Sequence, residues 1–332
     1  LQGAVASSER IFKLLDTRPE IVDVPEPLEL PSPGRGEIEF RDVWFHYGAA
    51  GNREPGTGDR LQQHTGPSTL PGGPRNGQGD SGGAGGREED AQWVLRGVSF
   101  TIRPGERVAV VGATGSGKST IINLLMRFYE PQRGEILFDG VPISRVRTAD
   151  LRERIGLVLQ DVFLFSEEVR SNITLGRTHL SDEQVGAAAG RVGADAFIRR
   201  LPAGYDQKLG ERGASISVGE RQLISFARAL VFDPLVLVLD EATSSVDSEL
   251  EARIQNALEA LMLGRSTLVV AHRLSTVQSA DQILVLHHGE IRERGTHVEL
   301  LRNGGLYSRL HELQFAAAAT GEGAPPLRHP AA

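Results

Sequence analysis

The octapeptide G-A-T-G-S-G-K-S, residues 112–119, constrains the fold of this chain more than any other stretch. It follows the apolar run R-V-A-V-V and leads into residues 119–129, whose apolar side chains recur at helical spacing. It fits the pattern G-x-x-x-x-G-K-[ST], in which a glycine-rich loop between a strand and a helix cradles a polyphosphate on its backbone N–H groups. We therefore predict a strand, a phosphate-binding loop and a helix, in this order.

The residue types in this loop match that chemistry. Its glycines let the backbone turn tightly, so that N–H groups can face phosphates. Lys118 is placed to reach the β- and γ-phosphates, and the Ser119 hydroxyl can bind Mg²⁺. The alternative, a glycine-rich turn without a ligand, is weak because the match is complete in a chain with only three lysines. The predicted nucleotide-binding residues here are Gly112, Thr114, Gly115, Ser116, Gly117, Lys118, Ser119 and Thr120.

Three further apolar runs end in polar residues. I-G-L-V-L-Q ends in Gln160, T-L-V-V-A-H ends in His272, and L-V-L-V-L-D-E ends in Asp240 and Glu241. These runs alternate with predicted helices, which indicates a parallel α/β sheet covered on both faces. Because the carboxyl ends of parallel strands meet at one edge, we expect these side chains to lie beside the phosphate loop. The predicted helices span residues 182–200, 218–232 and 248–263.

The acids at that edge have distinct expected roles. Asp240, at a strand tip, is placed to hold Mg²⁺ directly or through water, and Glu241 is placed to polarise an attacking water. Strands often end in acids, so this pair gains its weight from the phosphate loop. A lone histidine at a strand end is more often a structural residue than a catalytic one, so its position alone does not assign a role to His272.

A second helix start stands at S-I-S-V-G-E-R-Q, residues 215–222. Ser217 and Glu220 have the spacing of a capping box, in which each side chain bonds the other residue's backbone N–H. The same helix start also offers unpaired N–H groups and positive dipole, which suit an anion. The local sequence leaves both interpretations open.

Composition excludes several classes of protein. The 332 residues are 39% hydrophobic and 24% charged, which is typical of a globular protein. A net charge of -7 argues against nucleic-acid binding. Without cysteine the chain can form neither disulfides nor thiolate metal sites. No apolar run approaches the ~20 residues that a membrane-spanning helix needs.

The sequence divides into segments of different character. Residues 1–36 are predicted to be a short helix followed by a proline-rich linker, and residues 37–315 the folded domain, with a strand at 37–47. Residues 49–92 contain 12 glycines and 4 prolines among 44 residues, so we expect a disordered insertion rather than a folded glycine-rich loop. Residues 316–332 are expected to form a flexible tail.

In type and order, these motifs resemble the nucleotide-binding domain of ATP-binding cassette (ABC) transporters. The likeness covers residues 37–48 and 93–315 and includes the Walker A loop, Gln160, the signature position 216–220, the Walker B strand 235–240, Glu241, the D-loop-like 244–247 and His272. It implies a P-loop NTPase fold with a mostly parallel core sheet, an antiparallel β subdomain and an α-helical signature subdomain. Residues 1–18 look like the end of a last membrane helix and linker, which points to the exporter branch.

The resemblance also implies roles for individual residues. Tyr47 looks like the aromatic residue that stacks on adenine, and Gln160 would bind Mg²⁺ and the attacking water. Glu241 would act as the catalytic base, His272 would hold the γ-phosphate, and Lys118 would neutralise it. Ser217 and Gly219 would contact the γ-phosphate held by a partner domain. ATP and Mg²⁺ are the expected cofactors.

The partners implied are a second ABC ATPase domain and the coupling helices of a transmembrane domain, which would meet residues 161–173. The expected location is the cytoplasmic face of the cell membrane, and the expected function is ATP hydrolysis that powers export through head-to-tail dimerisation. Val218 and Glu220 depart from the usual L-S-G-G-Q signature. These departures favour a heterodimer slightly over a homodimer.

Other readings remain at this point. A non-transport ABC ATPase, in DNA repair or translation, would share the motifs but should show a coiled-coil insertion or basic arms. A P-loop kinase or GTPase would lack the signature. A module that binds ATP without hydrolysing it is opposed only by the presence of Glu241.

Overall fold

The computed structural model describes residues 21–48, 93–210, 213, 215–240, 248–271 and 274–313, with the backbone alone at 248–251 and 274–275. Several sequence predictions lie outside these residues. They are the helix at 1–18, the insertion 49–92, Glu241, the D-loop-like 244–247, His272 and the tail 316–332.

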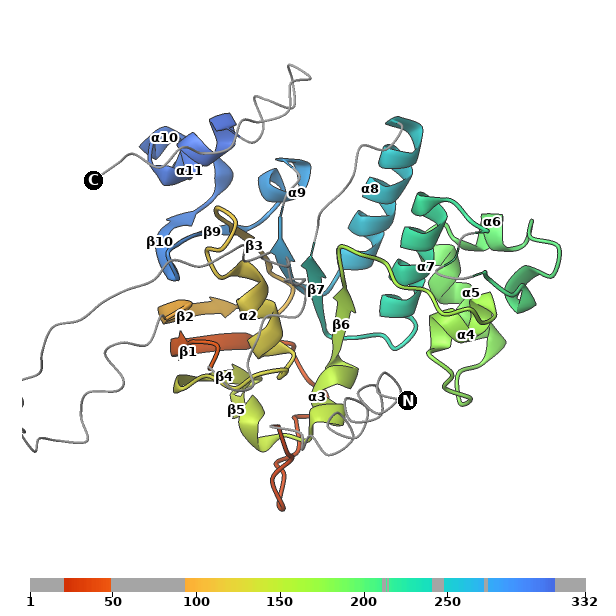
Figure 1. Ribbon diagram of the computed structural model, residues 1–332, viewed down its shortest axis with the longest axis horizontal. Helices are drawn as coiled ribbons and strands as arrows, with labels where there is room; N and C mark the ends of the chain where they lie inside the picture. The colour runs from red at the N-terminus through yellow and green to blue at the C-terminus, as the bar shows by residue number, and fades with distance from the viewer. Residues whose placement is uncertain are drawn as a thin grey trace, which may run out of the picture.

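A six-stranded sheet forms the centre of the molecule (Figure 1). Its order is β10-β9-β3-β8-β7-β6, with β9, β3, β8, β7 and β6 parallel and β10 antiparallel to β9. The strands are β3 (Arg107–Val111), β6 (Ile155–Val158), β7 (Val236–Asp240), β8 (Ser266–Val270), β9 (Gln282–His287) and β10 (Glu290–Gly295). All five residues of β8 are buried, as expected for a strand covered on both faces. The predicted parallel α/β sheet is confirmed.

A second sheet of four antiparallel strands lies beside the first, in the order β2-β1-β4-β5. Its strands are β1 (Ile38–Phe45), β2 (Leu95–Ile102), β4 (Arg133–Phe138) and β5 (Val141–Pro142). Helix α2 (Lys118–Leu125) joins the sheets in one core, in which its Ile121 and Leu124 pack with Phe40 of β1 and Val108 of β3. Each such buried side chain contributes about 1.5–3 kcal/mol to folding.

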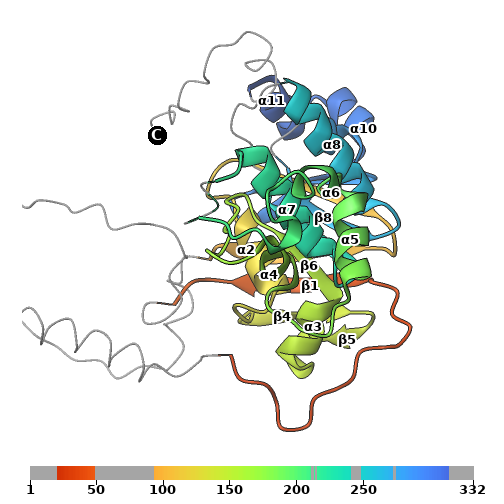
Figure 2. The ribbon, with the colours of Figure 1, turned by 90° about the vertical axis from the view of Figure 1, so that its right-hand side faces the viewer.

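A helical lobe lies beyond β6 and β7, on the side away from the four-stranded sheet (Figures 1 and 2). It contains α4 (Val169–Thr174), α5 (Asp182–Arg191), α6 (Asp195–Ile198) and α7 (Val218–Leu230), with α8 (Ser248–Met262) alongside. The helix predicted over 182–200 is interrupted, because Gly193 adopts a φ of 72° after α5 ends. The parallel core, the antiparallel sheet and the helical lobe confirm the predicted fold class.

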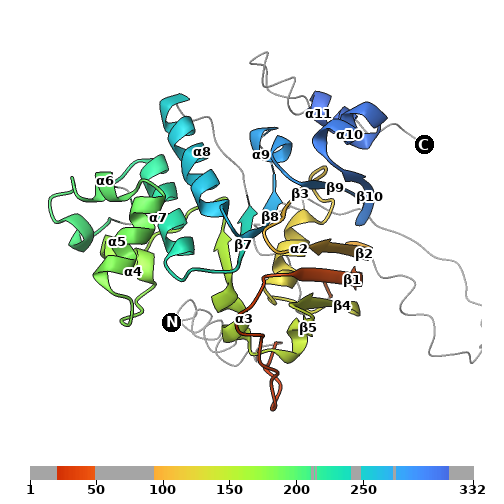
Figure 3. The ribbon, with the colours of Figure 1, turned by 180° about the vertical axis from the view of Figure 1, so that it is seen from behind.

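The remaining elements lie at the edges of the molecule. They are η1 (Ile143–Arg145), α3 (Thr148–Arg154), η2 (Gly204–Asp206), α9 (Leu274–Gln278), α10 (His297–Asn303) and α11 (Leu306–His311). Helices α10 and α11 lie together next to β10, at the far end from the helical lobe (Figure 3). Within the described part of the chain, every helix is too short or too polar to cross a bilayer.

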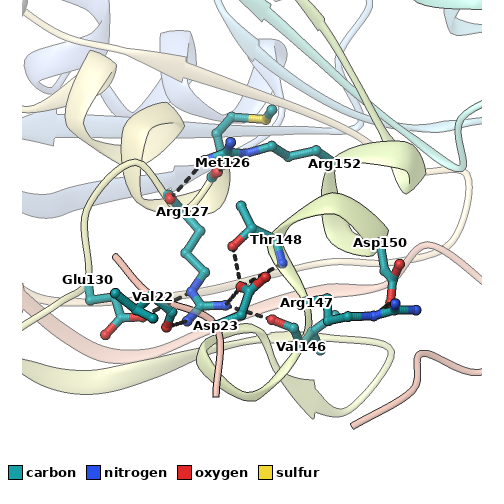
Figure 4. Close-up of polar contacts among 10 residues, drawn as sticks. All are labelled: Val22, Asp23, Met126, Arg127, Glu130, Val146, Arg147, Thr148, Asp150 and Arg152. Atoms are coloured by element: carbon teal, nitrogen blue, oxygen red, sulfur yellow. Dashed lines mark hydrogen bonds and ion pairs between the residues drawn. The ribbon is translucent and has the colours of Figure 1, made fainter. Parts of the chain in front are cut away.

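Residues 21–36 run along the domain and contact it at several points. Arg127, at the end of α2, is 2% exposed and donates hydrogen bonds to the Asp23 carboxylate (3.3 Å), the Glu130 carboxylate (2.9 Å) and the Val146 carbonyl (2.6 Å) (Figure 4). Asp23 also accepts from the Thr148 backbone N–H and hydroxyl at 2.9 and 2.6 Å. Asp23 thereby caps the start of α3 and neutralises a buried guanidinium at the end of α2.

A second contact fixes the other end of this segment. The Asp139 carboxylate accepts from three successive backbone N–H groups, at Arg35 (2.8 Å), Gly36 (3.2 Å) and Glu37 (2.8 Å). Gly34 lies close against the domain, since a Cβ there would lie 2.6 Å from Leu235 Cδ1 and would require the Leu235 side chain to shift. The segment is therefore held at both ends by carboxylates.

The chain leaves β1 and enters β2 at neighbouring points. The Val94 backbone N–H donates to the Phe45 carbonyl at 2.8 Å. The ring of Trp93 lies edge-on to His46, with centroids 5.0 Å apart, and edge-on to Trp44 at 5.5 Å. The Arg133 guanidinium lies 5.5 Å from the centre of the Trp93 ring. These contacts join the ends of the segment between Gly48 and Trp93.

Candidate functional site

The phosphate loop runs from the end of β3 to the start of α2, in the order predicted from the sequence. Its glycines are required by close approach. A Cβ at Gly112 would lie 2.3 Å from the Leu286 carbonyl oxygen, and one at Gly117, where φ is 104°, would lie 2.7 Å from Leu95 Cδ2. The loop can therefore hold this path only with glycine at these positions.

Lys118 begins α2, and its ammonium group folds back over the loop. Its Nζ donates to the carbonyls of Gly112 (2.8 Å) and Ala113 (3.0 Å), and the residue is 8% exposed. Burial lowers the pKa of Lys118, while the negative charge of Asp240 acts to raise it. The lysine is thus a poorly solvated cation at the loop, which favours an anion beside it.

The loop opens into a cavity of about 460 Å³. The residues that line it come from both sheets, the loop and α2, and they are Tyr47, Val94, Thr114, Gly115, Gly117, Lys118, Ser119, Thr120, Gln160, Asp240 and Val270. Nine of these eleven are residues that the sequence predicted for the site. Val94 and Val270 are additions, and no sequence motif marks them, since apolar residues at strand ends are common.

Ser116 lies in the wall of the loop and marks it as built for a ligand. Its residue is 5% exposed, and its buried Oγ has no hydrogen-bond partner among the described residues. A buried hydroxyl without a partner costs about 1–3 kcal/mol. A polyphosphate, with many acceptor oxygens, is the type of group that offsets this cost, so the loop fits the nucleotide predicted for it.

Tyr47 forms the wall of the cavity contributed by the antiparallel sheet. It lies two residues beyond the end of β1 and lines the same cavity as Lys118. An aromatic ring and a phosphate loop in one cavity match the two parts of a nucleotide, since a base has a flat face that stacks and a polyphosphate is an anion.

Two further polar residues reach the cavity from strand ends. Asp240 is the last residue of β7, and Gln160 lies two residues beyond the end of β6. With Ser119 they offer a carboxylate, an amide and a hydroxyl, which are oxygen ligands of the kind Mg²⁺ accepts. No cluster of three or more acidic or histidine side chains occurs in the described residues, so the donor set fits an ion that also binds phosphates rather than an all-protein cage.

The start of α7 forms the predicted capping box. The Ser217 hydroxyl accepts from the Glu220 backbone N–H at 3.2 Å, and the Glu220 carboxylate accepts from the Ser217 N–H and hydroxyl, each at 2.9 Å. Ser217 and Val218 are exposed, whereas Gly219 is buried. The cap is thus confirmed. Ser217 and Gly219 belong to the helical lobe and do not line the cavity of their own chain.

An exposed apolar surface occurs in the segment between the end of β6 and the start of α4. Leu159, Phe163 and Phe165 are each about half exposed, and the two phenylalanine rings meet edge-on at 5.1 Å. The backbone beneath them is fixed. Fully buried Asn172 bonds both the N–H and the carbonyl of Phe165, and Arg228 of α7 donates to the carbonyls of Phe163 (3.0 Å) and Asn172 (2.8 Å).

Comparison with known proteins adds an independent line. Residues 95–244 match the family model described as ABC transporter. An ABC transporter ATP-binding protein of Bacillus subtilis, YfiC, named as uncharacterized, is 44% identical over 313 residues, or 94% of this chain and 45% of that protein. An ATP-dependent lipid A-core flippase of Alkalilimnicola ehrlichii is 43% identical over 316 residues, or 95% of this chain and 46% of that protein.

A solved structure agrees. The structure of a bacterial Atm1-family ABC exporter with ATP bound matches with a TM-score of 0.71 and 37% identity, over 98% of this chain and 48% of that chain. The chain therefore spans about half the length of the relatives it matches. Fold, motif order and these likenesses lead to one conclusion: the chain carries the ATP-binding domain of the ABC transporter family, which is an ATPase domain.

Proposed function

We propose that this chain binds Mg-ATP in the cavity at the phosphate loop and hydrolyses it to power export across a membrane. The observation that carries the proposal is the single cavity shared by Lys118, Tyr47, Gln160 and Asp240, which come from segments far apart in the sequence. The relatives named as a flippase and an exporter support transport as the purpose. A role in DNA repair or translation has no comparable support.

The polar residues that line the cavity each have a part in this reaction. The loop amides and Lys118 bind and neutralise the β- and γ-phosphates, and phosphoryl transfer is catalysed mainly by such positioning and charge. Ser119, Gln160 and Asp240 would hold Mg²⁺, which neutralises charge on the phosphates when bound. From sequence alone, Glu241 is assigned to orient the attacking water.

The active unit in this proposal is a pair of ATPase domains closed head to tail around ATP. The start of α7 is exposed and outside its own chain's cavity, so its helix dipole is free to meet a phosphate held by a partner. His272 is assigned from sequence to the γ-phosphate in the same closed state. The Ser217 hydroxyl already donates its hydrogen bond to the Glu220 carboxylate, so this signature would bind a phosphate more weakly than the usual L-S-G-G-Q. This favours a different partner chain slightly over a second copy.

The exposed surface of Leu159, Phe163 and Phe165 is where we place the coupling helix of a transmembrane domain. Its rings are apolar, and Arg228 bonds its backbone to α7. A displacement of this surface would therefore be transmitted to α7, which carries the signature at its start. The chain would accordingly work at the cytoplasmic face of a membrane.

The test is the solution mass of the Glu241→Gln variant with and without Mg-ATP. Removing the base is expected to trap a closed pair, because ATP then binds the pair and is not consumed. A dimer that forms only with ATP supports the proposal and a homodimer. A monomer that binds ATP supports the proposed site with a different partner chain, and a chain that binds no ATP refutes the proposal.

A further inference from the structure

The ring of Tyr47 contacts two aromatic neighbours that do not line the cavity. Tyr129, beyond the end of α2, meets it edge-on with centroids 5.3 Å apart and an interplanar angle of 89°. Phe45 meets it edge-on at 4.8 Å and 87°, and also contacts Tyr129 at 5.7 Å. Edge-to-face contacts of this kind favour one orientation of the ring plane.

The hydroxyl of Tyr47 is held separately, by the helix that carries the phosphate-binding lysine. Its Oη lies 3.1 Å from Thr120 Oγ1 and accepts from Asn123 Nδ2 at 3.4 Å. Thr120 is 1% exposed, and Thr120 and Asn123 lie one helical turn apart on the same face of α2. The distance between the ring and the phosphate loop is therefore set by α2 itself.

We propose that Tyr129 and Asn123 are positioning residues for recognition of the nucleobase, and that they act only through Tyr47. Tyr47 lies beyond the last residue of β1, so the ladder of the sheet does not fix its side chain. Tyr129 and Asn123 supply the missing constraint on the Tyr47 ring. They hold the ring at a fixed distance from the phosphate loop, as a base joined to a triphosphate through one sugar requires. This inference rests on the proposed function, because it takes Tyr47 as the stacking surface for the base of ATP.

Two ligands separate this role from a general effect on folding. ATP engages both the ring and the loop, whereas inorganic tripolyphosphate engages the loop alone. We would measure the dissociation constants of the chain for both ligands, with Mg²⁺, in Tyr129→Leu, Asn123→Ala and Tyr47→Leu variants. Tyr129→Leu is expected to weaken ATP binding about 2- to 10-fold and to leave tripolyphosphate binding unchanged.

Two further variants act as controls. Tyr129→Phe keeps the ring and is expected to bind ATP with the affinity of the wild-type chain. Tyr205→Leu removes a half-buried tyrosine of the helical lobe, far from the cavity, and is expected to leave both constants unchanged. In the Tyr47→Leu background, Tyr129→Leu and Asn123→Ala are expected to have no further effect, because they act through the missing ring.

The outcomes are distinct. Equal loss of ATP and tripolyphosphate binding in Tyr129→Leu and Asn123→Ala, or an effect that persists without the Tyr47 ring, overturns the positioning role. No effect of either substitution on ATP binding also overturns it. A wild-type chain that binds neither ligand refutes the proposed function itself, and one that binds both equally refutes recognition of the base by Tyr47.

Discussion

Lys118 is a residue whose burial is costly for the fold and which the proposed function requires. Its ammonium is almost buried and held by two loop carbonyls, neither of which carries a full negative charge. Burial therefore lowers its pKa, and only the charge of Asp240 opposes that shift. A bound polyphosphate adds negative charge at this place, so binding is expected to raise the pKa of Lys118 again.

Lys118→Ala is accordingly expected to lower the rate of ATP hydrolysis about 10²-fold or more, because a charge aimed at the transferred phosphoryl group is lost. Steady-state hydrolysis with saturating Mg-ATP measures this effect. Lys208→Ala removes an exposed lysine of the helical lobe and should leave the rate unchanged. A Lys118→Ala chain of normal activity would contradict the assigned role.

Glu220 is expected to affect the ATP-dependent association of two ATPase domains. Its carboxylate accepts a hydrogen bond from the Ser217 hydroxyl, and a phosphate in a closed pair would compete for the same donor. Glu220→Gln keeps the side-chain length and removes the charge, so ATP-dependent association of the Glu241→Gln chain is expected to strengthen about threefold to tenfold, as for loss of 0.7–1.4 kcal/mol of repulsion. Sedimentation at several chain concentrations measures it, and unchanged association would show that Glu220 does not weaken this signature.

Among the elements, α7 connects two surfaces with different tasks. Its first turn carries the capping box, and Arg228 near its last turn bonds the backbone beneath Phe163. Burial lowers the pKa of Arg228, and its guanidinium is held by the carbonyls of Phe163 and Asn172. A single rigid helix thus spans from the signature to the exposed apolar surface.

Arg228→Ala is expected to lower the free energy of unfolding by about 1.5–3 kcal/mol, because hydrogen bonds from a charged donor to the backbone carbonyls of Phe163 and Asn172 are lost. Urea denaturation followed by circular dichroism measures the change. Arg200→Ala, at an exposed position of the same lobe, should change stability by less than about 0.5 kcal/mol. A similar loss of unfolding free energy in both variants would show that the hydrogen bonds of Arg228 do not stabilise the fold more than an exposed arginine does.

Elements also show what the sequence could and could not predict. The parallel strands, the loop between β3 and α2 and the α7 cap follow from local patterns, and the structure confirms each of them as an element of the fold. The break after α5 was missed, because apolar spacing over 182–200 continues across Gly193. The contacts of Tyr129 and Arg228 were missed as well, because each joins residues from separate elements and no local spacing marks such pairs.

At the scale of the whole molecule, residues 21–36 are fastened across the domain rather than left free beside it. Asp23 joins the end of α2 to the start of α3 (Figure 4). Helix α3 is followed in the chain by β6 and then by Gln160. A displacement of the chain before residue 21 would therefore act on two helices that lead to the nucleotide cavity. The exposed apolar surface at Phe163 would not be the only mechanical route into this domain.

Asp23→Asn is expected to lower the free energy of unfolding at neutral pH by about 1–3 kcal/mol, because buried Arg127 loses one of its two carboxylate partners among the described residues and keeps only Glu130. Hydrogen bonds from Thr148 hold the pKa of Asp23 below its usual value of 3.8. The carboxylate therefore stabilises the fold above pH 3.8 and loses this effect as the pH falls through its lower folded pKa.

The difference between wild type and Asp23→Asn should accordingly shrink in acid, as measured by urea denaturation at a series of pH values. Glu26→Gln, an exposed acid in the same segment, serves as the control and should show no such difference. A constant difference at every pH would show that the charge of Asp23 is not what stabilises the fold.

The closed junction between Gly48 and Trp93 has a practical consequence. Since the Val94–Phe45 hydrogen bond and the Trp93–His46 contact already join the two sides, the chain between them can change in length without pulling β1 from β2. A fluorescent protein domain spliced in at this junction would stand a few residues from Tyr47. The molecule thus offers a ready position for an optical sensor of nucleotide occupancy.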